Sequence, residues 1–85
     1  MGLVSEVVAA EELIPRASAL ASEIARGPSV AIELMKRLTQ DGLTRGLDEQ
    51  VQMEEYLQQI TRDSEDALEG RNSFLEKREP VFRGR

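Results

Sequence analysis

From Glu11 onward the apolar residues recur at helical spacing, and this spacing constrains the fold more than any other feature of the sequence. The first run places its apolar residues at i, i+4, i+7, i+8 and i+11, on one helix face: Leu13, Ala17, Leu20, Ala21 and Ile24. Pro15 costs little in a first helical turn, so the regular helix is expected to start close to it. Gly27 and Pro28 are expected to end this helix and open the next.

Two further helices are predicted after this break. The second covers about residues 29–40, and the third covers about residues 47–62, with Gly42 and Gly46 bracketing the loop between them. The third helix carries its apolar residues on one stripe: Met53, Tyr56, Leu57 and Ile60.

Ser64 is the expected N-cap of a fourth helix. This helix is predicted to run to about Lys77, and Pro80 stops it from continuing. Gly70 lies in its interior, where glycine costs about 1 kcal/mol relative to alanine. We therefore expect Gly70 to permit the close approach of another helix or of a ligand.

The predicted fold class is all-α, with about four helices after a short extended N-terminal segment. Residues 1–10 form the extended lead-in, residues 11–79 the helical region and residues 80–85 a basic tail. The helix seams are narrow and rich in alanine, so some apolar surface is expected to meet another chain or domain. If these helices cover another domain, five apolar side chains are expected to be exposed when the helices are separated from it: Leu20, Ile24, Leu34, Leu38 and Leu57.

The composition excludes several classes of function. With no Cys and no His among the 85 residues, disulfides, thiolate zinc sites and Ser-His or Cys-His nucleophiles are excluded. The net charge of −5 disfavours nonspecific nucleic-acid binding. The sequence has neither an apolar run of about 20 residues nor the pattern of a signal peptide, so we expect a cytoplasmic protein without a membrane partner.

Three acidic clusters are candidates for chemistry, and they are read as solvated or capping groups. Neighbouring carboxylates on a helix point in different directions, and the third cluster stands at a helix N-terminus, where negative charge is favourable. No catalytic pair and no metal site is predicted from them. The clusters are Glu11–Glu12, Glu54–Glu55 and the group Asp63, Glu65, Asp66 and Glu69.

The basic end of the chain allows two interpretations. Phe74 precedes Lys77 by three residues, so both are expected on one helix face, where a ring and an ammonium could bind a base and a phosphate. Alternatively, Phe74 and Leu75 belong to a core, and the cations complement the helix C-terminus. The residue pattern alone favours the second interpretation.

Four segments of the sequence resemble one known family. GLVSEVV, AEEL, ALASEIARGPSVAIELMKRL and SEDALEGRNSFLEKREPVFRGR resemble, in this order, the C-terminal part of the enoyl-CoA hydratase/isomerase (crotonase) family. The most specific match is to the closing motif of that family: Glu69-Gly70, Phe74, Glu76-Lys77-Arg78, Pro80 and Phe82.

The resemblance implies a role in acyl-CoA chemistry without a catalytic residue in this chain. In the family, the oxyanion-hole amides and the catalytic glutamates precede the strand-like segment that GLV matches. The C-terminal helices build the trimer interface and cover the acyl-CoA site. Only Phe74 and Lys77 match binding positions, near the adenine and phosphates of coenzyme A, which is not held covalently.

The resemblance therefore predicts the C-terminal oligomerisation and acyl-CoA-covering region of a hydratase or isomerase, inactive alone. Its partners would be copies of itself or a crotonase-like core subunit. One alternative is a free-standing helical oligomerisation module without catalytic activity. A second is an isolated module that binds coenzyme A or a nucleotide through the tail.

Overall fold

The structure is a computed structural model that describes residues 2–85. Its elements follow in the order η1 (Ala10–Glu12, a 3-10 turn), α1 (Leu13–Ala25), α2 (Ser29–Asp41), α3 (Leu47–Arg62) and α4 (Glu65–Glu76). Residues 2–85 contain no strand. The predicted all-α class with four helices is therefore confirmed.

The helix boundaries agree closely with the sequence-based ones. α1 contains Pro15 in its first turn and ends before Gly27, and α3 has the predicted bounds. α4 ends at Glu76, one residue early, because Lys77 takes a left-handed conformation with φ 54° and ψ 44°. The division into lead-in, helical region and basic tail stays a prediction, and Met1 lies outside the described residues.

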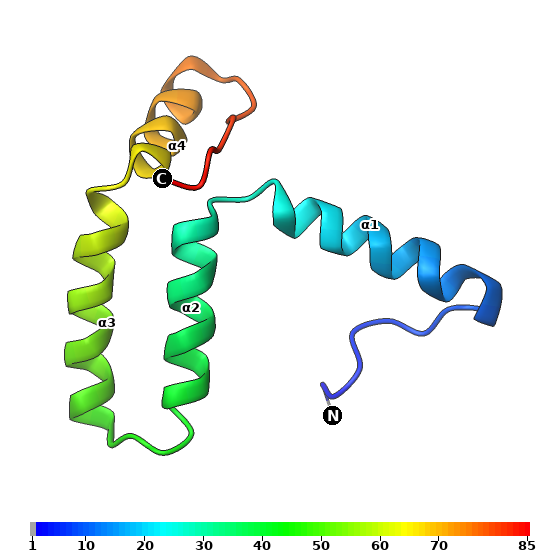
Figure 1. Cartoon of the computed structure of the whole chain (residues 1–85), viewed down its shortest axis with the longest axis horizontal. Coiled ribbons are helices and arrows are strands. Elements are labelled where there is room, and N and C mark those ends of the chain that lie inside the picture. Colours follow the sequence, from blue (N-terminus) through cyan, green and yellow to red (C-terminus); the bar gives the residue numbers. More distant parts are fainter. Residues whose placement is uncertain (1) are drawn as a thin grey trace.

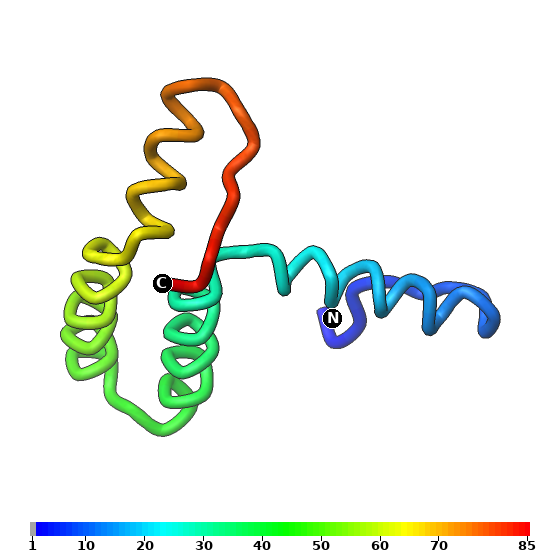
Figure 2. The backbone as a smooth tube through the Cα atoms, turned by 45° about the horizontal axis from the view of Figure 1, so that its top comes forward, coloured from blue at the N-terminus to red at the C-terminus, as the bar shows by residue number. Residues whose placement is uncertain are grey.

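The helices form an open, flat arrangement (Figure 1). α2 and α3 lie antiparallel as a hairpin, α4 continues beyond the end of α3, and α1 points away from the hairpin. Figure 2 shows the residues after α4 running back along that helix, so that the C-terminus lies near the start of α2. The molecule measures 43 × 39 × 18 Å along its principal axes.

The α2–α3 hairpin contains the small apolar core. Leu57 is 5% exposed and is the single large apolar side chain buried among the described residues. Leu34 and Leu38 of α2 are half-buried and line, together with Leu57, a cavity of about 270 Å³ between the two helices. The expected exposure was therefore wrong for Leu57, which is buried, and for Leu34 and Leu38, which are half-buried, because α2 and α3 cover one another.

The turn between the two helices is closed by polar contacts. The Gln50 side-chain amide donates to the Leu38 carbonyl at 3.0 Å and so satisfies an acceptor at the end of α2. Arg45 donates to the Asp41 carboxylate at 3.1 Å. These contacts fix the hairpin at the end opposite to α4.

Within residues 2–85, α1 packs mainly on the 3-10 turn η1 that precedes it. None of its residues is buried, and Ile14, Leu20 and Ile24 are exposed. The Arg16 Nε–H donates to both oxygens of the Glu6 carboxylate, at 3.1 and 2.8 Å, and this ion pair connects the preceding segment to the helix. The radius of gyration is 16.2 Å, against about 12 Å expected for a compact domain of this length, so α1 leaves apolar surface available for another molecule.

Gly70 and Gly84 differ in whether the structure would accept a side chain at their positions. A methyl group at Gly70 would lie 3.7 Å from the Phe82 ring, an ordinary van der Waals distance, so the tail, and no helix, approaches Gly70. Gly84 has a φ of +74°, and a methyl group there would collide with the Ser29 hydroxyl at the start of α2. Gly84 is thus required by its backbone conformation and by its neighbour, whereas Gly70 is not.

This contrast predicts opposite effects of the same substitution on stability. Gly70→Ala is expected to stabilise the chain by up to about 1 kcal/mol through helix propensity. Gly84→Ala is expected to destabilise it by about 1–2 kcal/mol, since alanine disfavours positive φ. Thermal unfolding followed by circular dichroism measures both, and a lower melting temperature for Gly70→Ala would contradict the assignment.

Candidate functional site

The start of α4 is formed by the predicted cap. The Ser64 hydroxyl accepts a hydrogen bond from the Ala67 backbone N–H at 3.1 Å, which confirms Ser64 as the N-cap. Glu65 and Asp66 occupy the first turn, where carboxylates complement the helix dipole. One face of this turn receives the returning tail.

Asp66 binds the end of the tail through its carboxylate. Its two oxygens accept hydrogen bonds from the backbone N–H groups of Arg83 at 2.7 Å and Gly84 at 2.8 Å. Its own backbone N–H donates to the Arg85 carbonyl at 2.9 Å. Asp66 is 3% exposed, so a buried carboxylate is satisfied by backbone donors from a segment 17 and 18 residues away.

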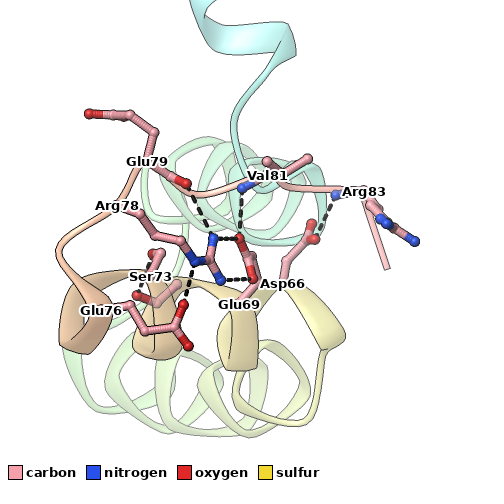
Figure 3. A network of polar contacts seen from close by, with 9 residues as sticks. Asp66, Glu69, Ser73, Glu76, Arg78, Glu79, Val81 and Arg83 are labelled. Atoms are coloured by element: carbon pink, nitrogen blue, oxygen red, sulfur yellow. Dashed lines mark hydrogen bonds and ion pairs between the residues drawn. The ribbon is translucent and has the colours of Figure 1, made fainter.

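Glu69, one turn later, binds the start of the tail. Its carboxylate accepts two nearly parallel hydrogen bonds from the Arg78 guanidinium, at 2.6 and 2.9 Å, and a third from the Val81 backbone N–H at 2.8 Å (Figure 3). The hydrogen bonds from Arg78 and then Val81 lower the pKa of Glu69 to about 2. Arg78 also donates to the Glu76 carboxylate at 2.6 Å, and its paired carboxylates raise its pKa above the usual value.

We call Asp66, Glu69 and residues 78–85, which these carboxylates bind, the tail clamp. Residues of the clamp line a cavity of about 520 Å³ between α4 and the tail. The tail has no regular secondary structure, so these contacts take the place of a helix or sheet ladder in satisfying its backbone donors.

Lys77 lies in the turn that reverses the chain between α4 and the tail. Its N–H donates to the Phe74 carbonyl at 3.3 Å, and the Arg78 N–H donates to the Ser73 carbonyl at 3.0 Å. This pair of bonds is the Schellman motif, which usually has glycine at the left-handed position. Lys77 is the non-glycine residue with positive φ in the described chain.

The Phe74 ring is exposed close to this turn. Phe74 is 83% exposed, and its neighbour Leu75 is 72% exposed, so neither residue belongs to a core in this chain. The expectation that Phe74 and Lys77 share a helix face was wrong, because Lys77 lies beyond the last helical residue. The two side chains nevertheless leave the same helix end, both exposed to solvent.

The cations of the basic end have different environments. Arg78 and Arg85 form ion pairs, with Glu69 and Glu65 respectively, whereas no ion pair within residues 2–85 involves Lys77. The Lys77 ammonium therefore remains available for an external anion. An exposed aromatic ring can stack on a flat group, and an exposed ammonium can pair with an anion.

The predicted role of the acidic clusters was wrong for two residues of the third cluster, Asp66 and Glu69. The solvated or capping role holds for exposed residues such as Glu65, but Asp66 is buried, and both Asp66 and Glu69 bind the tail. The residue pattern around Asp66 and Glu69 did not indicate this role. The available signal was the spacing of two carboxylates at i and i+3, followed by Pro80, which keeps the chain from continuing as a helix.

Within the part of the chain that the structure describes, no group of three or more His, Cys, Asp or Glu residues could hold a metal ion. None of the helices built from these residues has the length and apolarity needed to cross a membrane.

The comparisons with known proteins agree with one another. The family model for enoyl-CoA hydratase/isomerase matches residues 1–85. The chain is 40% identical over 85 residues to a probable enoyl-CoA hydratase of Rhodobacter capsulatus, covering 100% of this chain and 33% of that protein. It is 34% identical over 84 residues to the 1,2-epoxyphenylacetyl-CoA isomerase of Escherichia coli, covering 99% of this chain and 32% of that protein.

Solved structures show the same similarity. An enoyl-CoA hydratase of Bacillus anthracis matches with a TM-score of 0.90 and 33% identity, over 99% of this chain and 33% of that one. An enoyl-CoA hydratase/isomerase of Mycobacterium paratuberculosis matches with a TM-score of 0.89 and 31% identity, over 99% and 33% of the two chains.

Together with the helical fold and the motif of α4, these matches define the class: the chain belongs to the enoyl-CoA hydratase/isomerase family. It spans about a third of the length of the relatives that it matches.

The low pKa of Glu69 predicts a pH dependence of stability. The pKa falls from 4.5 to about 2 on folding, so the stabilisation by Glu69 is complete above about pH 4.5 and is lost as the pH falls towards 2. Glu69→Gln is expected to lower the free energy of unfolding at pH 6, and this deficit should shrink steadily below pH 4.5.

Urea unfolding of the unaltered chain and of Glu69→Gln at several pH values measures this difference in the free energy of unfolding. Glu54→Gln, at an exposed position outside the clamp, is the control for loss of a carboxylate. A deficit for Glu69→Gln that does not change between pH 6 and pH 3 would contradict the assignment.

Proposed function

We propose that this chain is the oligomerisation and acyl-CoA-covering region of an enoyl-CoA hydratase/isomerase-family protein. The observation that carries this proposal is that most large apolar side chains within residues 2–85 are exposed or half-buried. Only one of them, Leu57, is buried. Apolar surface of this extent is typical of a segment that packs on another domain or subunit. The exposed faces of α1 and of the α2–α3 hairpin would supply the contacts.

The proposed ligand is the coenzyme A part of an acyl-CoA thioester. The relatives and structural neighbours are named as enzymes of enoyl-CoA or of other CoA thioesters, which supports this ligand class. In this proposal, the exposed Phe74 ring stacks on adenine, and the unpaired Lys77 ammonium pairs with a phosphate. Catalytic groups would come from a crotonase core, so the chain alone would be inactive.

The exposed face of α1 predicts self-association of the purified chain. Leu20→Glu places a charge among the apolar residues of α1, whereas Ser22→Glu places the same charge on the opposite side of the helix. Since no residue of α1 is buried, both variants should keep the fold.

Static light scattering across a concentration series measures this effect. We expect oligomers for the unaltered chain and for Ser22→Glu, and a shift towards monomer for Leu20→Glu. A stable monomer of the unaltered chain at high concentration would contradict the association part of the proposal.

The proposed contacts of Phe74 and Lys77 with coenzyme A predict weaker binding when either side chain is removed. Lys77→Ala is expected to lower the affinity by about 1 kcal/mol, roughly fivefold in Kd, at low salt, and by less at high salt, since salt screens an exposed charge pair. Phe74→Ala should weaken binding at both salt concentrations.

Titration calorimetry with coenzyme A, on the chain and on the chain combined with a crotonase core, measures these affinities. Lys36→Ala, which removes an exposed lysine from α2, is the control for net charge. An affinity for Lys77→Ala equal to that of the control at low salt would leave Lys77 with a capping role only. Association without any binding of coenzyme A would favour the free-standing oligomerisation module.

A further inference from the structure

Lys77 occupies a backbone conformation that lysine does not favour. A left-handed non-glycine residue costs free energy, and such residues persist only where the surrounding contacts hold them. The left-handed position of a Schellman motif usually carries glycine, which adopts this conformation without that cost. The choice of lysine at this turn therefore points to a requirement for its side chain.

The tail clamp supplies the contacts that hold this conformation. Arg78, the next residue, is fixed at its backbone by the bond to the Ser73 carbonyl and at its side chain by the two bonds to Glu69. Further along, the Val81 N–H is bound by the same carboxylate, and Asp66 binds the end of the tail. Arg78 and Val81 are thus fixed to Glu69 of α4 (Figure 3). Lys77 makes the reversal between the last residue of α4, Glu76, and this fixed tail.

We infer that Glu69 and Asp66 are positioning residues for the ammonium of Lys77: by fixing the tail against α4 they keep Lys77 left-handed and so direct its side chain to the ligand beside Phe74. This inference rests on the proposed binding of coenzyme A. Phe74 lies within α4, so its own contribution to binding should be independent of the clamp.

The sign of the expected effect separates positioning from simple electrostatics. Coenzyme A is a polyanion, so the loss of a nearby carboxylate should by charge alone strengthen its binding. If Glu69 positions Lys77, Glu69→Gln weakens binding in spite of the lost negative charge. Glu65→Gln is the matched control, since Glu65 lies in the same helix but binds only the exposed Arg85 side chain.

The experiment combines two readouts on the full chain: the affinity for coenzyme A and the conformation of Lys77. The amide-to-Hα distance within a left-handed residue is short, so a strong intraresidue nuclear Overhauser effect reports the conformation of Lys77 without ligand. We expect this signal to weaken in Glu69→Gln and in Asp66→Asn, and to stay unchanged in Glu65→Gln.

A double-mutant cycle then tests the link to binding. Glu69→Gln is expected to weaken the affinity about fivefold in the unaltered chain and to cause no further loss in a Lys77→Gly background, because the group that it positions is absent there. Lys77→Gly alone should weaken binding while raising the melting temperature. If Glu69→Gln lowers the helix content, Arg78→Lys replaces it in the cycle, since lysine keeps the charge but cannot form the bidentate pair.

The possible failures are distinguishable. Equal losses of affinity in both backgrounds, or an unchanged Lys77 signal in Glu69→Gln, would overturn the positioning role and leave the proposed function intact. Equal binding of coenzyme A by the unaltered chain and by Lys77→Gly would overturn the Lys77 contact of the proposed function, and the positioning role with it.

Discussion

The small amount of apolar burial is the constraint on which the rest of the structure depends. One large apolar side chain, Leu57, is buried within residues 2–85, so hydrophobic packing fixes the α2–α3 hairpin and little else. The other end of the molecule is organised by polar contacts, in which two carboxylates of α4 bind backbone N–H groups and one guanidinium of the tail. Charge-assisted hydrogen bonds of this kind are directional, so they define a geometry even where little surface is buried.

The sequence predicted the helices well because their boundaries depend on local chemistry. Ser64 caps a helix through its own hydroxyl, and Gly27 with Pro28 ends one helix and begins another, whatever the rest of the chain does. The family resemblance rested on a closing motif that is likewise local. These features need no knowledge of long-range contacts.

The candidate site was predicted only in part, because its geometry depends on contacts between distant residues. Phe74 and Lys77 were identified, but the helical spacing that placed them together assumes that Lys77 is helical, and it is not. Asp66 was assigned to the helix dipole, since nothing in its neighbourhood reveals backbone donors that lie 17 and 18 residues further along the chain. A left-handed lysine also has no sequence signal, because glycine is the residue that pattern rules expect at that position.

Because the connection between α1 and α2 is short, a small rotation there moves the far end of α1 by a larger distance. α1 contains 13 residues, and a helix of that length extends about 20 Å, so a rotation of about 10° at Gly27 would displace its far end by about 3 Å. A methyl group at Gly27 would overlap the tip of the Ile32 side chain, which can move, so the pivot is bordered by a deformable neighbour. Small adjustments of a few backbone torsions there would let the apolar face of α1 follow a surface of somewhat different curvature.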